Sequence, residues 1–132
     1  MIKQIDRLFS LLSRISRADK NGYAECICCS KRDHWANFDP AHYVGRAFFG
    51  LRWDLKNVWP CCRDCHEKEN HLALYRIGLI KIKGLQFVED LEFAGKQFCK
   101  EPNHEELVEL RDNIERELHR YTYQNRPPES RA

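Results

Sequence analysis

The sequence lacks any uninterrupted apolar run that approaches the roughly 20 residues of a membrane-spanning helix. Its start, MIKQIDRLFSLLSRISRADK, scatters charges among apolar residues, so we expect no signal peptide and no membrane partner. It also lacks internal repeats and long low-complexity tracts, which excludes a repeat array. A length of 132 residues is that of one domain with a modest core, to which a bound metal would add useful stability.

The chain has little net charge, +2 at neutral pH, but its two parts differ in sign. Residues 101–132 hold five Lys and Arg against eight Asp and Glu, which leaves 17 basic against 12 acidic residues, or +5, on residues 1–100. A basic surface on the first hundred residues is compatible with a phosphate-bearing partner such as DNA. Modestly basic faces are common, so this bias carries little weight by itself.

Cysteine, by contrast, is plentiful, with seven residues in the chain. The number is odd and no leader is expected, so we expect a cytoplasmic protein, whose paired cysteines hold a metal more often than each other. Two knuckles of Cys-x-x-Cys spacing supply the four ligands of a tetrahedral structural Zn²⁺ site: Cys26, Cys29, Cys62 and Cys65. Cys28 and Cys61 are either buried small side chains or alternative ligands.

Hydrophobic periodicity predicts helices at both ends of the chain. Apolar residues recur at helical spacing over residues 2–19 and again over 66–82 and 85–98, where Cys99 is expected in the core. The clearest helix runs from 103 to 123 and begins with a capping pair, Asn103 and Glu106. Between the first two helices, prolines, glycines and β-formers favour short strands and a hairpin.

These elements divide the chain into four predicted parts. They are an N-terminal amphipathic helix at 1–22, a zinc-stapled core at 23–82, C-terminal helices at 83–123 and a disordered tail at 124–132.

Three short motifs stand between and just after the knuckles. They are Asp39-Pro-Ala-His42-Tyr-Val-Gly-Arg46, Leu55-Lys-Asn57-Val-Trp-Pro and Cys65-His66-Glu-Lys68. Their order, histidine then asparagine then a histidine directly after the last cysteine, resembles the HNH endonucleases. Ala41-His-Tyr-Val-Gly-Arg46 and Tyr75-Arg-Ile-Gly-Leu-Ile80 are similar, more narrowly, to the phage NinG (Rap) recombination nucleases. The resemblance implies an α+β fold, with a small zinc-stapled ββα-metal (HNH, His-Me finger) core flanked by N- and C-terminal helices.

The resemblance and the chemistry of phosphodiester hydrolysis together suggest roles for these residues. His42 is the best general base, because an imidazole with a pKa near 6.5 is mostly neutral in the cell and can accept a proton from water. By resemblance, Asn57 orients the His42 segment, and His66 is a ligand of a catalytic divalent metal. The family places an aspartate ligand directly before the base, where this chain has Ala41. Asp39, on the same face of a regular strand, is the proposed replacement.

Reserve ligands for that metal are His34, Glu69 and His71, whereas His104 and His119 are expected on the surface. Arg46 is the expected phosphate clamp, since a guanidinium grips two phosphate oxygens at once. Further contacts to the DNA backbone are assigned to Arg52, Lys56, Arg63 and Lys68.

The predicted function is therefore a metal-dependent DNA endonuclease that uses a one-metal HNH mechanism with Mg²⁺ or Mn²⁺ and leaves a 5′-phosphate. The NinG likeness implies branched or Holliday-junction DNA, a phage or prophage source, the cytoplasm of a bacterial host and a homodimer. Two alternatives stay open. In the first, the chain is a non-catalytic zinc module that binds nucleic acid, and Ala41 marks a decayed site. In the second, the chain is an adaptor that binds protein partners.

Overall fold

The computed structural model describes residues 1–124, so the tail predicted at 124–132 lies, from residue 125 on, outside the described residues. Over the described part, the chain forms six α-helices and two small antiparallel sheets, which confirms the predicted α+β class. The helices are α1 (Ile2–Ile15), α2 (Phe49–Arg52), α3 (Arg63–His66), α4 (His71–Lys83), α5 (Leu85–Ala94) and α6 (His104–Gln124). The strands are β1 (Tyr23–Glu25), β2 (Arg32–His34), β3 (Asp39–His42) and β4 (Val58–Cys61), with 3₁₀ turns at Trp35–Asn37 and Leu55–Asn57.

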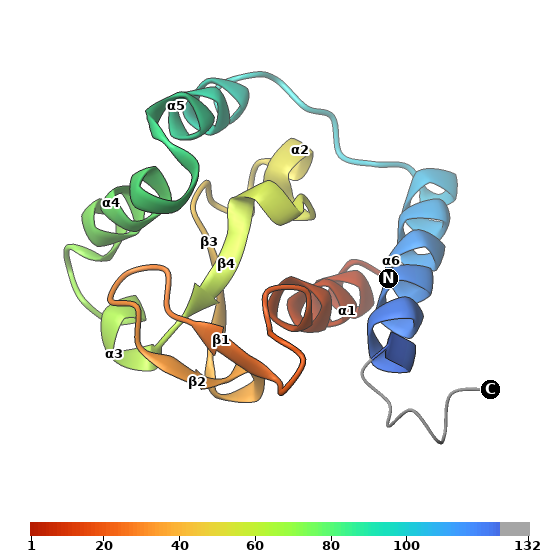
Figure 1. Ribbon diagram of the computed structural model, residues 1–132. Helices are drawn as coiled ribbons and strands as arrows, with labels where there is room; N and C mark the ends of the chain where they lie inside the picture. The colour runs from red at the N-terminus through yellow and green to blue at the C-terminus, as the bar shows by residue number, and fades with distance from the viewer. Residues whose placement is uncertain (125–132) are drawn as a thin grey trace.

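Two hairpins form the centre of the molecule (Figure 1). Strands β1 and β2 pair with Tyr23 opposite His34, and the turn between them carries the first cysteine knuckle. Strands β3 and β4 pair with Asp39 opposite Cys61, and β4 leads through the second knuckle into α3. The Ile27 N–H of the first knuckle donates to the Pro60 carbonyl at 2.9 Å, so the two hairpins are joined beside the cysteines.

One hydrophobic core lies between the β3–β4 hairpin and the helices α4 and α5. Its centre includes Ala41 of β3, Tyr75 and Leu79 of α4, and Val88 of α5, all fully buried. Helix α4 packs directly on the first knuckle at Gly78, where an added Cβ would lie 1.7 Å from the Ile27 carbonyl oxygen. Glycine is therefore required there, although the site lies inside a helix, where glycine is otherwise unfavourable.

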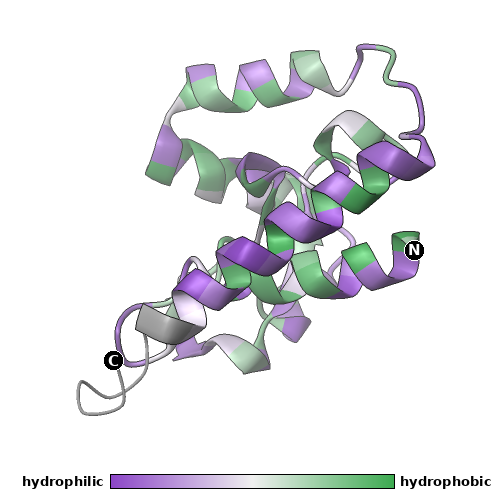
Figure 2. Cartoon of the chain, turned by 90° about the vertical axis from the view of Figure 1, so that its right-hand side faces the viewer, coloured by the Kyte–Doolittle hydropathy of each residue, from purple (hydrophilic) through white to green (hydrophobic). Residues whose placement is uncertain are grey.

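A second core joins the two ends of the chain. Ile5, Phe9 and Leu12 of α1 pack against Leu107 and Ile114 of α6, and buried Val58 links this cluster to β4. Figure 1 shows α1 and α6 on one side of the β3–β4 hairpin and α4 and α5 on the other. Figure 2 shows hydrophilic and hydrophobic residues alternating along α1 and α6, as expected for helices with one buried face. The predicted C-terminal helices thus divide, since α5 packs on α4 and α6 on α1.

The capping pair predicted for the last helix is confirmed. The Glu106 N–H donates to Asn103 Oδ1 at 2.9 Å, and the Asn103 N–H donates to Glu106 Oε1 at 3.2 Å. These reciprocal bonds satisfy donors that the first turn of a helix leaves free. Among residues 1–124, no helix combines the length and the apolarity that crossing a membrane requires.

Three predicted helix boundaries were wrong. Helix α1 ends at Ile15 rather than 19, because the Asp19 carboxylate accepts bonds from the N–H groups of Asn21 and Tyr23 and turns the chain into β1. The helix predicted at 66–82 is two helices, since α3 closes the second knuckle and ends at His66. Helix α5 ends at Ala94, so Cys99 lies exposed in the following coil and not in the core.

Candidate metal centre and active-site pocket

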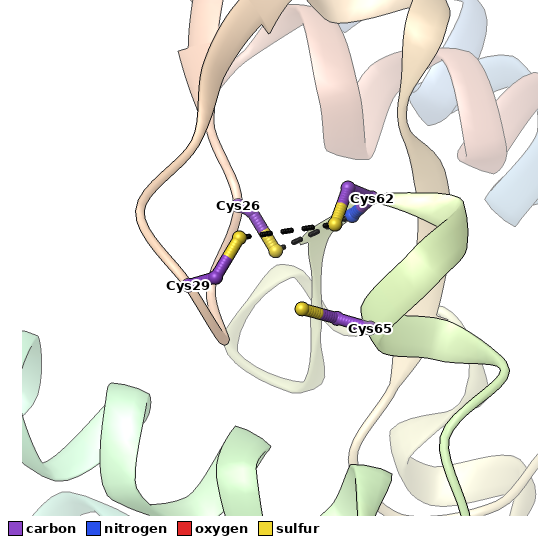
Figure 3. A group of neighbouring side chains, drawn as sticks. All are labelled: Cys26, Cys29, Cys62 and Cys65. Carbon is purple, nitrogen blue, oxygen red and sulfur yellow. Dashed lines mark hydrogen bonds between the residues drawn. The ribbon is translucent and has the colours of Figure 1, made fainter.

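The four knuckle cysteines meet between the two hairpins (Figure 3). Cys26 and Cys29 come from the β1–β2 turn, and Cys62 and Cys65 come from the end of β4 and the first turn of α3. Their sulfur atoms all lie within 4.8 Å of one another, and Cys29 Sγ is 3.8 Å from Cys62 Sγ. Sulfur atoms at the corners of a tetrahedron about 2.3 Å from zinc are about 3.8 Å apart, so this cluster could hold a structural metal such as zinc.

Two backbone N–H groups donate hydrogen bonds to Cys26 Sγ and favour its thiolate form. Its Sγ accepts the N–H of Cys28 at 3.4 Å and the N–H of Cys62 at 3.3 Å. Cys26 is also almost completely buried, at 2% exposure. Hydrogen bonds to the charged form of a buried group favour that form, so these donors support the thiolate that metal binding requires.

His42 stands at the end of β3 and is held through one ring nitrogen. Its Nε2 lies 2.9 Å from the carbonyl oxygen of Arg52, an acceptor, so Nε2 carries the proton. In the neutral ring Nδ1 is then the acceptor. Burial lowers the pKa of His42, with the cations of Arg46 and Arg52 adding to this effect and the Arg52 carbonyl and Asp6 opposing it. His42 therefore carries its proton on Nε2 and favours the neutral ring.

Asn57 is completely buried and ties the two ends of the long β3–β4 connection together. Its Oδ1 accepts the Val44 N–H at 2.8 Å, and its Nδ2 donates to the carbonyls of Val44 at 2.9 Å and Leu51 at 3.1 Å. The Val44 contacts fix the chain just after His42, and the Leu51 contact fixes the residue before Arg52. Asn57 thus holds both His42 and the carbonyl that His42 contacts.

Asp39 and His66 meet at the other end of β3. His66 Nδ1 lies 3.0 Å from Asp39 Oδ2, while Arg63 donates to Asp39 Oδ1 at 3.1 Å. The two side chains are hydrogen-bonded to each other, and 3.0 Å is also about the separation of neighbouring ligands of an octahedral ion at about 2.1 Å, so the pair could turn toward a divalent cation. The Arg63 side chain is 70% exposed and so has room to leave the carboxylate. Among the described residues, no group of three ligand side chains includes this pair.

A cavity of about 550 Å³ brings the two histidines together, and α1 forms one of its walls. Its lining combines polar residues of α1 with residues of the hairpin, the β3–β4 connection and α3: Asp6, Arg7, Phe9, Ser10, Pro40, His42, Gly45, Arg46, Val58 and His66. Asp39 and Ala41 are absent from that lining, because they lie on the other face of β3 from Pro40 and His42.

Sequence reasoning missed Asp6, the residue that joins α1 to this pocket. Its carboxylate accepts bonds from Arg52 at 3.0 and 2.6 Å and from the Trp53 indole at 2.9 Å. Burial alone would raise the pKa of Asp6, but these donors outweigh burial and lower it. The partners are 46 and 47 residues away in the chain, so no local pattern could have identified the contact.

The predicted DNA-binding residues occupy different environments. Arg46 lines the cavity and is 63% exposed, which suits a phosphate contact. Arg52 is only 16% exposed and is engaged with Asp6, so its guanidinium is directed into the protein. Lys56 and Lys68 are exposed but do not line the cavity.

Of the reserve ligands, only His71 lies near the metal centre. Its ring centroid is 4.9 Å from that of His66, and its Nδ1 is 3.9 Å from Cys28 Sγ. Burial is the main cause that lowers the pKa of His71. His34 instead caps a 3₁₀ turn by accepting the Ala36 N–H, and Glu69 is exposed.

Comparison with known proteins gives one family match. A protein-family model described as Bacteriophage Lambda NinG protein matches residues 1–122, nearly the whole chain. No curated protein and no solved structure matches the chain.

Proposed function

The chain belongs to the NinG family of bacteriophage lambda, and on that premise we propose that it is a metal-dependent DNA endonuclease of phage recombination. The proposal depends mainly on the orientation and the lowered pKa of His42. Its Nε2 is fixed by the Arg52 carbonyl, its pKa is lowered mainly by burial, and it shares a cavity with His66 and Arg46. A neutral, oriented imidazole beside a cation is what activation of water next to a phosphate requires.

In this proposal the side chains have distinct roles in a one-metal HNH mechanism. His42 Nδ1 accepts the proton of the attacking water, and the Arg52 carbonyl stabilises the imidazolium that forms. Arg46 binds a non-bridging oxygen of the phosphate. When held by Asp39 and His66, Mg²⁺ or Mn²⁺ would supply charge neutralisation at the phosphate and the leaving oxygen. Asn57 keeps the connection that carries these groups in place.

The substrate proposed is branched DNA, including Holliday junctions, cut to leave a 5′-phosphate and a 3′-hydroxyl. Support comes from the phage recombination context of the family match and from the exposed cation at the cavity. Because paired incisions across a junction need two active sites, the protein is proposed to act as a homodimer.

One experiment tests this proposal directly. The purified protein is incubated with linear, nicked, single-stranded and four-way-junction DNA in Mg²⁺ or Mn²⁺, beside His42→Ala. We expect cleavage by the parent and a loss of at least about 100-fold in the variant, the range of general-base contributions. His119→Ala, on the exposed part of α6, is the matched control and should cleave normally. Equal cleavage by His42→Ala would rule out this base.

A non-catalytic zinc module that binds nucleic acid is the second candidate. It is favoured by the ligand count, because within residues 1–124 no third ligand side chain joins Asp39 and His66, and Asp39 also binds Arg63. This candidate predicts salt-sensitive DNA binding that survives His42→Ala, with no cleavage in any divalent ion.

A further inference from the structure

A second group of cysteines lies directly beside the four-cysteine centre. Cys28 directly precedes Cys29 and Cys61 directly precedes Cys62, and with Cys26 their sulfur atoms lie within 4.8 Å of one another. Cys28 Sγ is 3.8 Å from Cys61 Sγ, the same separation as between Cys29 and Cys62. That is again the spacing of two sulfur atoms on one tetrahedral ion.

A fourth donor reaches one member of this second group, Cys28, from helix α4, and it must turn toward Cys26 and Cys61 to join them, because it lies outside the 4.8 Å limit that the three sulfur atoms share. His71 Nδ1 lies 3.9 Å from Cys28 Sγ, close to the separation of about 3.6 Å expected for nitrogen and sulfur on one zinc ion. His71 is the first residue of α4 and is partly buried against Tyr75, with ring centroids 5.6 Å apart.

We propose that the protein binds two zinc ions in one cluster, with Cys26 as the shared ligand. The first ion is held by Cys26, Cys29, Cys62 and Cys65, and the second by Cys26, Cys28, Cys61 and His71. The proposal does not rest on nuclease activity.

The charge balance allows the second ion. Four thiolates around one Zn²⁺ carry a formal charge of −2, and a second Zn²⁺ with two further thiolates adds no net charge. Binding forms bonds from Cys28 Sγ, Cys61 Sγ and His71 Nδ1 and a second bond from Cys26 Sγ. The S–H protons of Cys28 and Cys61 pass to water, so loading releases about two protons for this ion at neutral pH.

The second ion would also connect α4 to the hairpins. The ring of His71 packs against the ring of His66, which lines the candidate pocket. A metal bond at His71 would therefore restrain the position of His71 beside His66.

Metal analysis of the full chain tests the proposal. After removal of loosely bound ions with a chelating resin, we expect two zinc ions per chain in the parent and one in both Cys28→Ser and His71→Asn. Cys99→Ser, at an exposed cysteine outside both groups, is the matched control and should retain two. Because both variants keep the four-cysteine centre, circular dichroism should show a folded chain.

A second measurement reports on the shared ligand. With cadmium-113 in place of zinc, we expect two resonances that show scalar coupling to each other through Cys26 Sγ, and one uncoupled resonance in Cys28→Ser. One zinc ion per chain in the parent would overturn the proposal. So would a second ion that persists in Cys28→Ser or His71→Asn, or two cadmium resonances without coupling.

Discussion

Replacing Asn57 with alanine should be one of the most damaging single changes in this chain. The side chain is completely buried and makes three hydrogen bonds, all to the backbone of the β3–β4 connection. Alanine would leave the Val44 N–H without this acceptor and the carbonyls of Val44 and Leu51 without this donor. Because the position is fully buried, water could replace the amide only after a structural change.

The magnitude follows from those three groups. Each buried polar group left without a partner costs about 1–3 kcal/mol, and carbonyls lose less than N–H groups when other contacts remain. Partial relaxation of the connection reduces the sum, so we expect a loss of about 3–5 kcal/mol of unfolding free energy. Small domains have only about 5–15 kcal/mol in total, so the variant should be close to unfolding.

Urea unfolding, followed by circular dichroism at constant zinc concentration, measures this loss. Asn37→Ala is the matched control, because Asn37 donates to Asp33 at an exposed site and its loss should cost less than about 0.5 kcal/mol. An Asn57→Ala variant within 1 kcal/mol of the parent would refute the argument that these three bonds anchor the connection.

Three further changes have expected outcomes that urea unfolding can measure. Gly78→Ala places a Cβ 1.7 Å from the Ile27 carbonyl oxygen, so helix α4 must move and we expect a loss of more than about 3 kcal/mol. His42 has a lowered pKa in the folded chain, so the unfolded chain protonates first as pH falls. The contribution of His42 to stability should be constant above about pH 6.5, the unfolded value, and decrease below it until the folded pKa is passed. His71, whose pKa burial also lowers, adds a decrease in the same direction. Asp6→Asn weakens the paired bonds to Arg52 and, with the partly exposed position taken into account, should cost about 1–2 kcal/mol.

Each of these changes has a control. Gly45→Ala meets no atom within 4 Å and should leave stability nearly unchanged, so equal losses at both glycines would contradict the steric argument. His42→Gln should flatten part of the decrease in stability below pH 6.5, and an unchanged slope would assign the decrease to other groups. Asp112→Asn removes a partly exposed pair with Arg111 and should have little effect.

Local signals in the sequence predicted the elements that depend on neighbouring residues. A short stretch of sequence is enough to identify each of these features: the two Cys-x-x-Cys knuckles, the capping pair at Asn103 and the apolar stripes of α1 and α6. The stripe on α1 shows that one face is buried but not which surface covers it. Its packing on α6 and against the pocket depends on contacts across the whole chain, including Asp6 with Arg52, and no short window contains them.

The register of β3 explains why Asp39, and not residue 41, meets His66. Asp39 pairs with Cys61 at the end of the hairpin where the second knuckle begins, so it lies beside α3. Ala41 is two residues further along, about 7 Å away on the same face, where that face is covered by the core. It is completely buried, and its carbonyl accepts the Tyr75 hydroxyl at 2.6 Å.

An aspartate at position 41 would therefore place a carboxylate inside the core, at a cost of several kcal/mol, and not in the candidate pocket. Packing in this fold thus accounts for the small residue before His42. The nuclease and the binding module differ in what the Asp39 carboxylate binds, a divalent ion or Arg63. If Mg²⁺ or Mn²⁺ displaces Arg63 from the carboxylate, then Arg63→Ala should strengthen binding of that ion, and Asp39→Asn should abolish it in both backgrounds.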